Sequence, residues 1–140
     1  RGIEVQMSAT QLATYMFILY QSCCTHYGGL IKAGQHNPLS EKDVKRLGST
    51  YHAICNLFRD TPITDERSYL EDIPNIRGYI ARIRTAIAHH IDDQDIRFYM
   101  PQDTDDKSRY HIAIECDKIT LRTASGDVPF EEYPLWKTLR

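Results

Sequence analysis

The residues best suited to chemistry lie in one segment, Ala81–His90, which reads ARIRTAIAHH. In it, four residues separate Arg84 from His89, and His90 follows directly. An imidazole titrates near neutral pH and can serve as a general acid or base. A guanidinium stays protonated and can bind two phosphate oxygens, most strongly when negative charge builds up in a transition state. Arg84 and His89 together therefore suit proton transfer beside a phosphate.

Basic residues gather around this pair although the chain as a whole is slightly acidic. Its 17 Lys and Arg face 19 Asp and Glu, which gives a net charge of −2. A general nucleic-acid binder usually carries a basic face, so the overall balance argues against that class. Arg77, Arg82 and Arg84 nevertheless precede the two histidines in one segment. A nucleic-acid function would therefore depend on this local patch, or on a second subunit that adds to it.

A helix must position the pair, because isoleucines recur around it in steps of three and four residues. The stripe consists of Ile73, Ile76, Ile80, Ile83, Ile87 and Ile91. We expect the helix to start near Pro74, since proline costs little in a first turn. At about 100° per residue, Arg84 lies on the flank of the stripe. His89 lies about 140° around the helix axis from Arg84, on the same face as Arg82. Arg84 and His89 meet only if the helix loosens near Ala88, if the long Arg84 side chain reaches around, or if a second chain completes the site.

The R-x4-H motif in its apolar context, RTAIAH (residues 84–89), resembles the signature of the HEPN family (higher eukaryotes and prokaryotes nucleotide-binding domains). The motif matches strictly, and the helical layout of residues 8–92 matches loosely. The resemblance implies a small helical bundle that acts as a metal-independent ribonuclease. It further implies a symmetric homodimer with a shared cleft, a cytoplasmic setting in prokaryotic toxin–antitoxin or anti-phage defence, and an antitoxin or defence-system partner.

The resemblance also implies roles for individual residues. Arg84 and His89 would be catalytic, and four neighbours would contact RNA: Arg77, Arg82, Thr85 and His90. RNA carries its own nucleophile, so the 2′-hydroxyl would attack the phosphate and leave a 2′,3′-cyclic phosphate, with neither metal nor cofactor. Two departures from the family pattern stand out: Thr85 replaces the strongly polar residue that often follows the arginine, and Ile91 stands where some members carry a tyrosine that can be modified.

Other interpretations of the same residues remain open. The chain could be a catalytically inactive HEPN-like module that binds RNA or nucleotide or serves in assembly, or an unrelated helical interaction protein. Arg84 could be a surface charge paired with Asp72 or with one of the carboxylates in 92–95, and the two histidines could simply favour the helix C-terminus. A metal site in residues 89–95 is not expected, because adjacent histidines on a helix point about 100° apart.

The rest of the chain predicts a mainly α fold, with three long helices, short ones, and a small C-terminal β-hairpin. With 140 residues it is expected to form one HEPN-like domain, residues 1–140. Apolar spacing predicts one helix from Ser8 or Thr10 to a stop at Gly28–Gly29. A second runs from the N-cap Ser40 to Asp60. Residues 30–39 are expected to connect these helices, and residues 101–109 to form a charged loop. Alternation in residues 110–123 and the turn signal at Ser125–Gly126 predict the hairpin.

The four cysteines, Cys23, Cys24, Cys55 and Cys116, form no C-x-x-C pair. Scattered cysteines in a chain of this size favour buried or free thiols in a reducing compartment over a disulfide framework. No secretory signal is visible, and no apolar run approaches the roughly 20 residues that a membrane span needs. The sequence therefore predicts a cytoplasmic protein without a membrane segment.

Overall fold

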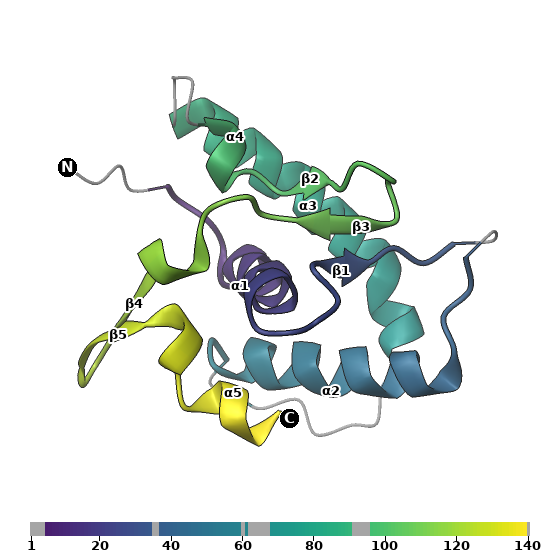
Figure 1. The fold of residues 1–140 in the computed structure, drawn as a ribbon, viewed down its shortest axis with the longest axis horizontal. Coiled ribbons are helices and arrows are strands. Elements are labelled where there is room, and N and C mark those ends of the chain that lie inside the picture. Colours follow the sequence, from purple (N-terminus) through teal and green to yellow (C-terminus); the bar gives the residue numbers. More distant parts are fainter. Residues whose placement is uncertain (1–4, 35–36, 60, 62–67, 91–95, 140) are drawn as a thin grey trace.

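The computed structural model describes residues 5–34, 37–59, 61, 68–90 and 96–139, and it confirms a mainly α fold (Figure 1). Within these residues there are three long helices, α1 (Ala9–Cys23), α2 (Glu41–Asn56) and α3 (Tyr69–His90). Two short helices, α4 (Ile96–Tyr99) and α5 (Leu135–Thr138), and two single 3₁₀ turns, Cys116–Lys118 and Phe130–Glu132, accompany them.

Helix α1 lies in the middle of the molecule, where Figure 1 shows it end-on between α2 and α3. Ser8 begins it with a capping box, in which the Ser8 hydroxyl accepts from the Gln11 amide and the Gln11 side chain accepts from the Ser8 amide. The helix ends at Cys23 rather than near the predicted glycine stop. The glycines instead belong to the turn that enters the first strand: a Cβ on Gly29, whose φ is +150°, would lie 2.5 Å from the Tyr110 carbonyl oxygen.

Helices α2 and α3 bury the stripes that their spacing predicts. Ser40 caps α2 by accepting from the Asp43 amide, and Leu47, Tyr51 and Ile54 are buried along its length. In α3 the buried isoleucines are Ile76, Ile80, Ile83 and Ile87, whereas Ile91 lies outside the described residues.

Helix α3 begins at Tyr69, one turn before the start predicted at Pro74. The extra turn is stabilised by contacts with distant residues. Tyr69 is buried with its ring centroid 6.1 Å from that of Phe17, and Asp72 Oδ2 lies 2.7 Å from His52 Nε2 on α2. These contacts outweigh the hydrogen bond that Pro74, without an N–H, cannot make inside the helix.

Three short strands form a sheet that the sequence did not predict. β1 (Leu30–Ile31), β2 (Gln102–Asp103) and β3 (Arg109–His111) pair antiparallel in the order β1-β3-β2. The segments expected to be a connection and a charged loop therefore each contribute an edge strand. Figure 1 shows β2 and β3 in front of α3, and side-chain contacts between Arg84 of α3 and Asp103 of β2 confirm that they are neighbours.

The predicted C-terminal hairpin is present as β4 (Thr120–Thr123) and β5 (Gly126–Pro129), which turn at residues 124–125. The alternation before Asp117 does not belong to it, because residues 116–118 form a 3₁₀ turn and Tyr110 pairs in the other sheet. The hairpin leads into Phe130 and Trp136, which are fully buried, and the Trp136 ring centroid lies 4.6 Å from that of Tyr20 on α1. The end of the described chain is thus part of the core.

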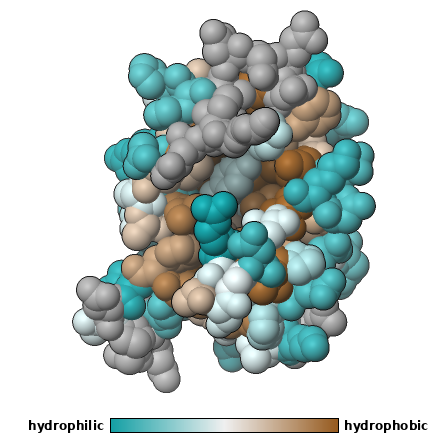
Figure 2. All heavy atoms as spheres, turned by 90° about the vertical axis from the view of Figure 1, so that its left-hand side faces the viewer, coloured by the Kyte–Doolittle hydropathy of each residue, from teal (hydrophilic) through white to brown (hydrophobic). Residues whose placement is uncertain are grey.

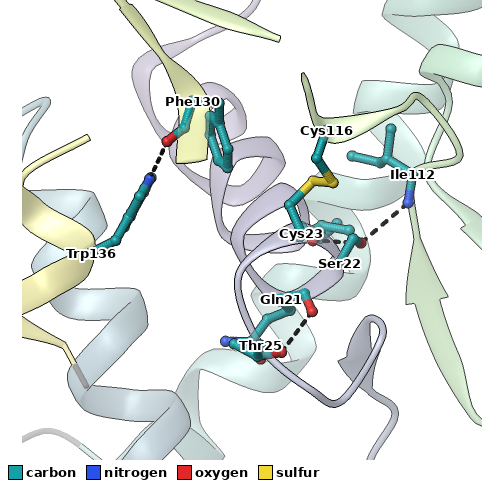
Figure 3. Close-up of a disulfide and its surroundings, with 9 residues drawn as sticks. Gln21, Ser22, Cys23, Thr25, Ile112, Cys116, Phe130 and Trp136 are labelled. Carbon is teal, nitrogen blue, oxygen red and sulfur yellow. Dashed lines mark hydrogen bonds between the residues drawn. A yellow bond between two sulfur atoms is a disulfide. The ribbon is translucent and has the colours of Figure 1, made fainter. Parts of the chain in front are cut away.

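A disulfide joins Cys23, the last residue of α1, to Cys116 (Figure 3). Their Cα atoms lie 5.7 Å apart, an ordinary spacing for this bond. Close by, the Ser22 hydroxyl accepts from the Ile112 amide at 3.4 Å, so the segment after β3 is attached to α1 at two points. The prediction of free thiols is therefore wrong for these two residues, while Cys55 is buried as a core residue. The cysteines no longer support a cytoplasmic location, which stays a prediction.

Some apolar surface remains outside the core. Figure 2 shows hydrophobic residues near the middle of one face, between hydrophilic ones. The large apolar side chains most exposed among the described residues are Leu12, Leu57, Leu70, Phe98 and Tyr99. Single exposed apolar residues are common on protein surfaces and do not by themselves mark a binding site.

Candidate functional site

The predicted catalytic pair lies near the C-terminal end of α3, which is one continuous helix through His90. The helix does not loosen near Ala88, so the first of the three ways of bringing the pair together is excluded. On a regular helix, Arg84 and His89 remain about 140° apart around the axis. The structure therefore keeps them on two sides of one helix, which leaves the reach of the Arg84 side chain and a second chain as the two ways to combine them.

Arg84 is anchored by a backbone carbonyl from outside its own helix rather than free in solvent. Its Nε–H donates to the carbonyl oxygen of Pro101 at 2.9 Å, and its Nη2 lies 3.7 Å from Asp103 Oδ1. Its guanidinium carbon lies 6.0 Å from the centroid of the Tyr110 ring. The side chain is still 40% exposed, so it is held in place yet accessible.

Among the described residues, the carboxylate beside Arg84 is not the alternative partner Asp72. Asp72 instead pairs with His52, and this contact links α2 to α3. The carboxylates of residues 92–95 lie outside the described residues. Asp103 is the carboxylate beside Arg84, and no sequence pattern indicates this pairing, because the two residues meet only through the small sheet.

Lys32, the residue that follows β1, lies beside the same carboxylate as Arg84. Its Nζ lies 2.8 Å from Asp103 Oδ1 and 4.7 Å from the centroid of the Tyr110 ring. The hydrogen bond from Lys32, together with the charges of Lys32 and Arg84, holds the pKa of Asp103 below its usual range. Lys32 and Asp103 were both missed in the sequence, because only strand pairing brings residues so distant in the chain together.

The two histidines differ in their surroundings. His90 is half-buried, and its Nδ1 lies 2.8 Å from the carbonyl oxygen of Ala86 in the preceding turn. His89 is exposed, with its ring centroid 5.5 Å from that of His90. His89 is therefore the histidine that a ligand in solvent can reach, and His90 is turned towards its own helix.

The remaining predicted RNA contacts, Arg77, Arg82 and Thr85, are exposed on α3. Arg77 donates to the carbonyl oxygen of Ala33, which follows β1. Arg82 lies with its guanidinium carbon 5.9 Å from the Tyr79 ring centroid, and the Thr85 hydroxyl donates to the Ala81 carbonyl at 3.1 Å. Arg77, Arg82, Arg84 and His89 thus all lie on one helix, and their contact with RNA stays a prediction.

Small residues separate these basic groups on the outer face of α3. By helical spacing, Gly78, Ala81, Thr85 and Ala88 form a strip between the flank that carries Arg84 and the flank that carries His89. A Cβ on Gly78 would meet, within 4 Å, only the far end of the Arg82 side chain, so nothing else in the described chain packs there. We call these four residues the small-residue strip.

No group of three or more metal-ligating side chains occurs within the described ranges, and Asp92, Asp93 and Asp95 fall outside them. None of the helices in those ranges combines the length and the apolar character needed to cross a bilayer. Comparison with known proteins identifies no relative: no family model, curated protein or solved structure matches this chain.

Proposed function

We propose that this protein is a metal-independent endoribonuclease of the R-x4-H type, which acts as a homodimer through Arg84 and His89. The observation that carries the proposal is the arrangement on α3. An anchored but accessible guanidinium and an exposed imidazole flank the small-residue strip near the end of one continuous helix. Neither group alone can cleave a phosphodiester, and together they supply both charge stabilisation and proton transfer.

A second copy of α3 packed on the small-residue strip would complete the site. Small side chains allow two helices to approach closely, because helix separation depends on the side chains at the contact. If the two helices run in the same general direction about a two-fold axis, the Arg84 flank of one copy faces the His89 flank of the other. Each rim of the interface then carries one guanidinium and one imidazole, which removes the 140° separation within a single chain.

The chemistry of such a site balances without a metal. One His89 imidazole takes the proton from the 2′-hydroxyl, and the 2′-oxygen forms a bond to phosphorus. The bond from phosphorus to the 5′-oxygen breaks, that oxygen takes a proton from a water molecule, and the protonated His89 returns its proton to the resulting hydroxide. Arg84 binds the phosphate oxygens as their negative charge increases. The products are a 2′,3′-cyclic phosphate and a 5′-hydroxyl.

A cleavage assay with adjacent histidines as a matched pair tests the assignment. The protein is incubated with single-stranded RNA in EDTA, and the product ends are identified by mass spectrometry. We expect 2′,3′-cyclic phosphates, loss of cleavage in His89→Ala, and most of the activity retained in His90→Ala, because His90 is turned to its own helix. Full activity of His89→Ala, or cleavage that EDTA abolishes, would contradict the proposal.

Mixing two inactive variants tests whether the site is shared between chains. In a dimer of Arg84→Ala and His89→Ala chains, one rim lacks both groups, and the other carries the intact Arg84 and the intact His89. We therefore expect cleavage to reappear on mixing, after the chains have been unfolded and refolded together. No recovery in verified mixed dimers would show that each chain works with its own pair.

The biological setting that the HEPN resemblance implies can be tested through the same activity. If the enzyme serves in a toxin–antitoxin or anti-phage system, its expression should arrest bacterial growth, and His89→Ala should relieve the arrest. The second candidate is an inactive module that binds RNA or nucleotide. It predicts binding without cleavage, and equal growth of bacteria that express the wild-type chain and bacteria that express His89→Ala.

A further inference from the structure

Two cationic side chains meet at one carboxylate beside the proposed site. Lys32 follows β1, Arg84 belongs to α3, and Asp103 belongs to β2. Asp103 Oδ1 lies 2.8 Å from Lys32 Nζ and 3.7 Å from Arg84 Nη2. Both cations also lie near the ring of Tyr110, at 4.7 Å and 6.0 Å from its centroid. Two positive charges thus share a single negative charge over one aromatic ring.

Within the described residues, the Asp103 carboxylate is hydrogen-bonded by Lys32 alone. Its distance to Arg84 is longer than a hydrogen bond, and its side chain is 42% exposed. Lys32 has three N–H donors, and Arg84 has four at its Nη atoms in addition to the one bound to Pro101, so both can bind further acceptors. Another anion that arrives from solvent can therefore replace the carboxylate without any change in the backbone.

The neighbouring carboxylate Asp106 shows the contrast. It accepts from the Thr104 hydroxyl at 2.8 Å and from the Ser108 amide and hydroxyl at 3.0 Å and 2.7 Å. These hydrogen bonds, led by that of the Ser108 hydroxyl, lower the pKa of Asp106 to about 2. The Asp106 carboxylate is thus fixed by hydrogen bonds within its own loop, whereas the Asp103 carboxylate contacts, among the described residues, the cations Lys32 and Arg84. The same loop fixes Lys32, whose amide donates to the Ser108 carbonyl at 3.0 Å.

We propose that Lys32 and Arg84 form a subsite for an RNA phosphate, and that Asp103 occupies this subsite as an intramolecular competitor when RNA is absent. The inference rests on the proposed ribonuclease function, which gives Arg84 its phosphate. It adds Lys32 as a second cation for the same nucleotide chain. It also gives Asp103 a role: its carboxylate takes the position of a phosphate oxygen and weakens binding to any anion that cannot displace it.

Equilibrium binding tests the subsite apart from cleavage. The probe is a fluorescein-labelled single-stranded 2′-O-methyl RNA, which has no free 2′-hydroxyl and is not cut, and anisotropy at low salt reports its binding. We expect Asp103→Asn to tighten binding about fivefold, because it frees two cations and removes one negative charge. Asp105→Asn, an exposed position two residues away, makes the same change in net charge and should tighten binding less than about twofold.

A double-mutant cycle with Lys32→Gln decides between a local site and a general charge effect. We expect Lys32→Gln to weaken binding and to abolish most of the gain from Asp103→Asn. Equal effects of Asp103→Asn and Asp105→Asn, or a gain that persists in Lys32→Gln, would overturn the subsite. All three positions are at least partly exposed, and thermal unfolding of each variant checks that the fold is retained.

The two proposals fail in different ways. If binding follows the cycle but the wild-type chain does not cut ordinary RNA, the phosphate subsite stands and the ribonuclease function falls. If cleavage depends on His89 but the cycle shows no coupling between Lys32 and Asp103, the ribonuclease function stands and the subsite falls.

Discussion

Arg84 donates its Nε–H to the carbonyl oxygen of Pro101 at 2.9 Å, across the junction between α3 and the segment that leads into β2. This hydrogen bond fixes the guanidinium by its inner nitrogen. The two outer nitrogens, which are the ones that can grip a phosphate in a fork, are left for other acceptors. Anchoring of this kind lowers the entropy that the side chain would lose on binding a substrate.

A lysine at position 84 would keep the charge and lose the anchor. Because a lysine offers neither the Nε–H nor a planar fork, we expect Arg84→Lys to lower kcat/KM for RNA cleavage about 10²- to 10³-fold. The free energy of unfolding should change by only about 1 kcal/mol, since the substitution removes one hydrogen bond and one exposed ion pair. Initial rates and urea denaturation measure the two quantities.

Arg82→Lys is the matched control for this prediction. Arg82 is exposed and lies near the Tyr79 ring without a hydrogen bond that fixes it to another element among the described residues. We expect its replacement by lysine to change the rate only a few-fold. If the two lysine variants lose activity equally, the anchored geometry of Arg84 has no special role.

The parts of the fold that could be predicted are those with long periodic patterns. The isoleucine stripe placed Arg84 on the flank of α3, and the structure half-buries it there. The start of α3 was misplaced because the local rule for Pro74 is weaker than the burial of Tyr69 and the pairing of Asp72 with His52. Tertiary contacts of this sort leave no periodic signal.

The missed parts depend on pairing between distant segments. β1 and β2 have two residues each, too short to show alternation, so the meeting of Lys32 with Asp103 could not be foreseen. The pairing of Cys23 with Cys116 spans 93 residues, and spacing alone does not reveal a disulfide partner. The candidate site was therefore predictable where it lies on one helix and unpredictable where it depends on the sheet.

The Cys23–Cys116 disulfide should contribute strongly to stability. It closes a loop across 93 residues, and cross-links over long loops restrict the unfolded chain most. We expect the paired substitution Cys23→Ser with Cys116→Ser to lower the free energy of unfolding by about 2–4 kcal/mol. Urea denaturation with and without dithiothreitol measures the effect. The reductant should destabilise the wild-type chain and leave the double variant unchanged; an equal response of both would contradict a disulfide between these residues.

Two buried tyrosines, Tyr51 and Tyr69, and the partly buried Tyr15 predict a steep loss of stability at alkaline pH. Burial raises the pKa of Tyr15, Tyr51 and Tyr69 above the ordinary value near 10. Below pH 10 these hydroxyls are protonated in both states. Above it the unfolded chain binds fewer protons than the folded one, so the free energy of unfolding falls as pH rises. Three such groups give a slope of about 4 kcal/mol per pH unit.

Absorbance at 295 nm follows tyrosine ionisation, and circular dichroism at 222 nm follows the loss of helical structure in the same titration. We expect part of the tyrosinate signal to appear only when the helical signal is lost. Tyr15→Phe removes one of the three groups and should reduce the slope by about a third. Its hydroxyl donates to the Tyr99 carbonyl at 2.6 Å, so the variant should also be less stable near neutral pH. Full tyrosine ionisation while the helices remain intact would contradict the burial of these side chains.

Trp136 is expected to hold the C-terminal segment in the core by both its volume and its hydrogen bond. The ring is fully buried, and its Nε1–H donates to the Phe130 carbonyl at 2.6 Å (Figure 3). Trp136→Phe keeps an aromatic ring but leaves that carbonyl with the Tyr133 amide as its remaining donor, so the lost hydrogen bond should cost about 0.5–1.5 kcal/mol. Trp136→Ala also leaves a cavity and should cost about 3–5 kcal/mol. Circular dichroism in urea measures both variants, since the only tryptophan of the chain is lost. If Trp136→Phe is as stable as the wild-type chain, the hydrogen bond contributes nothing to stability. If Trp136→Ala is also as stable as the wild-type chain, the C-terminal segment does not depend on this residue.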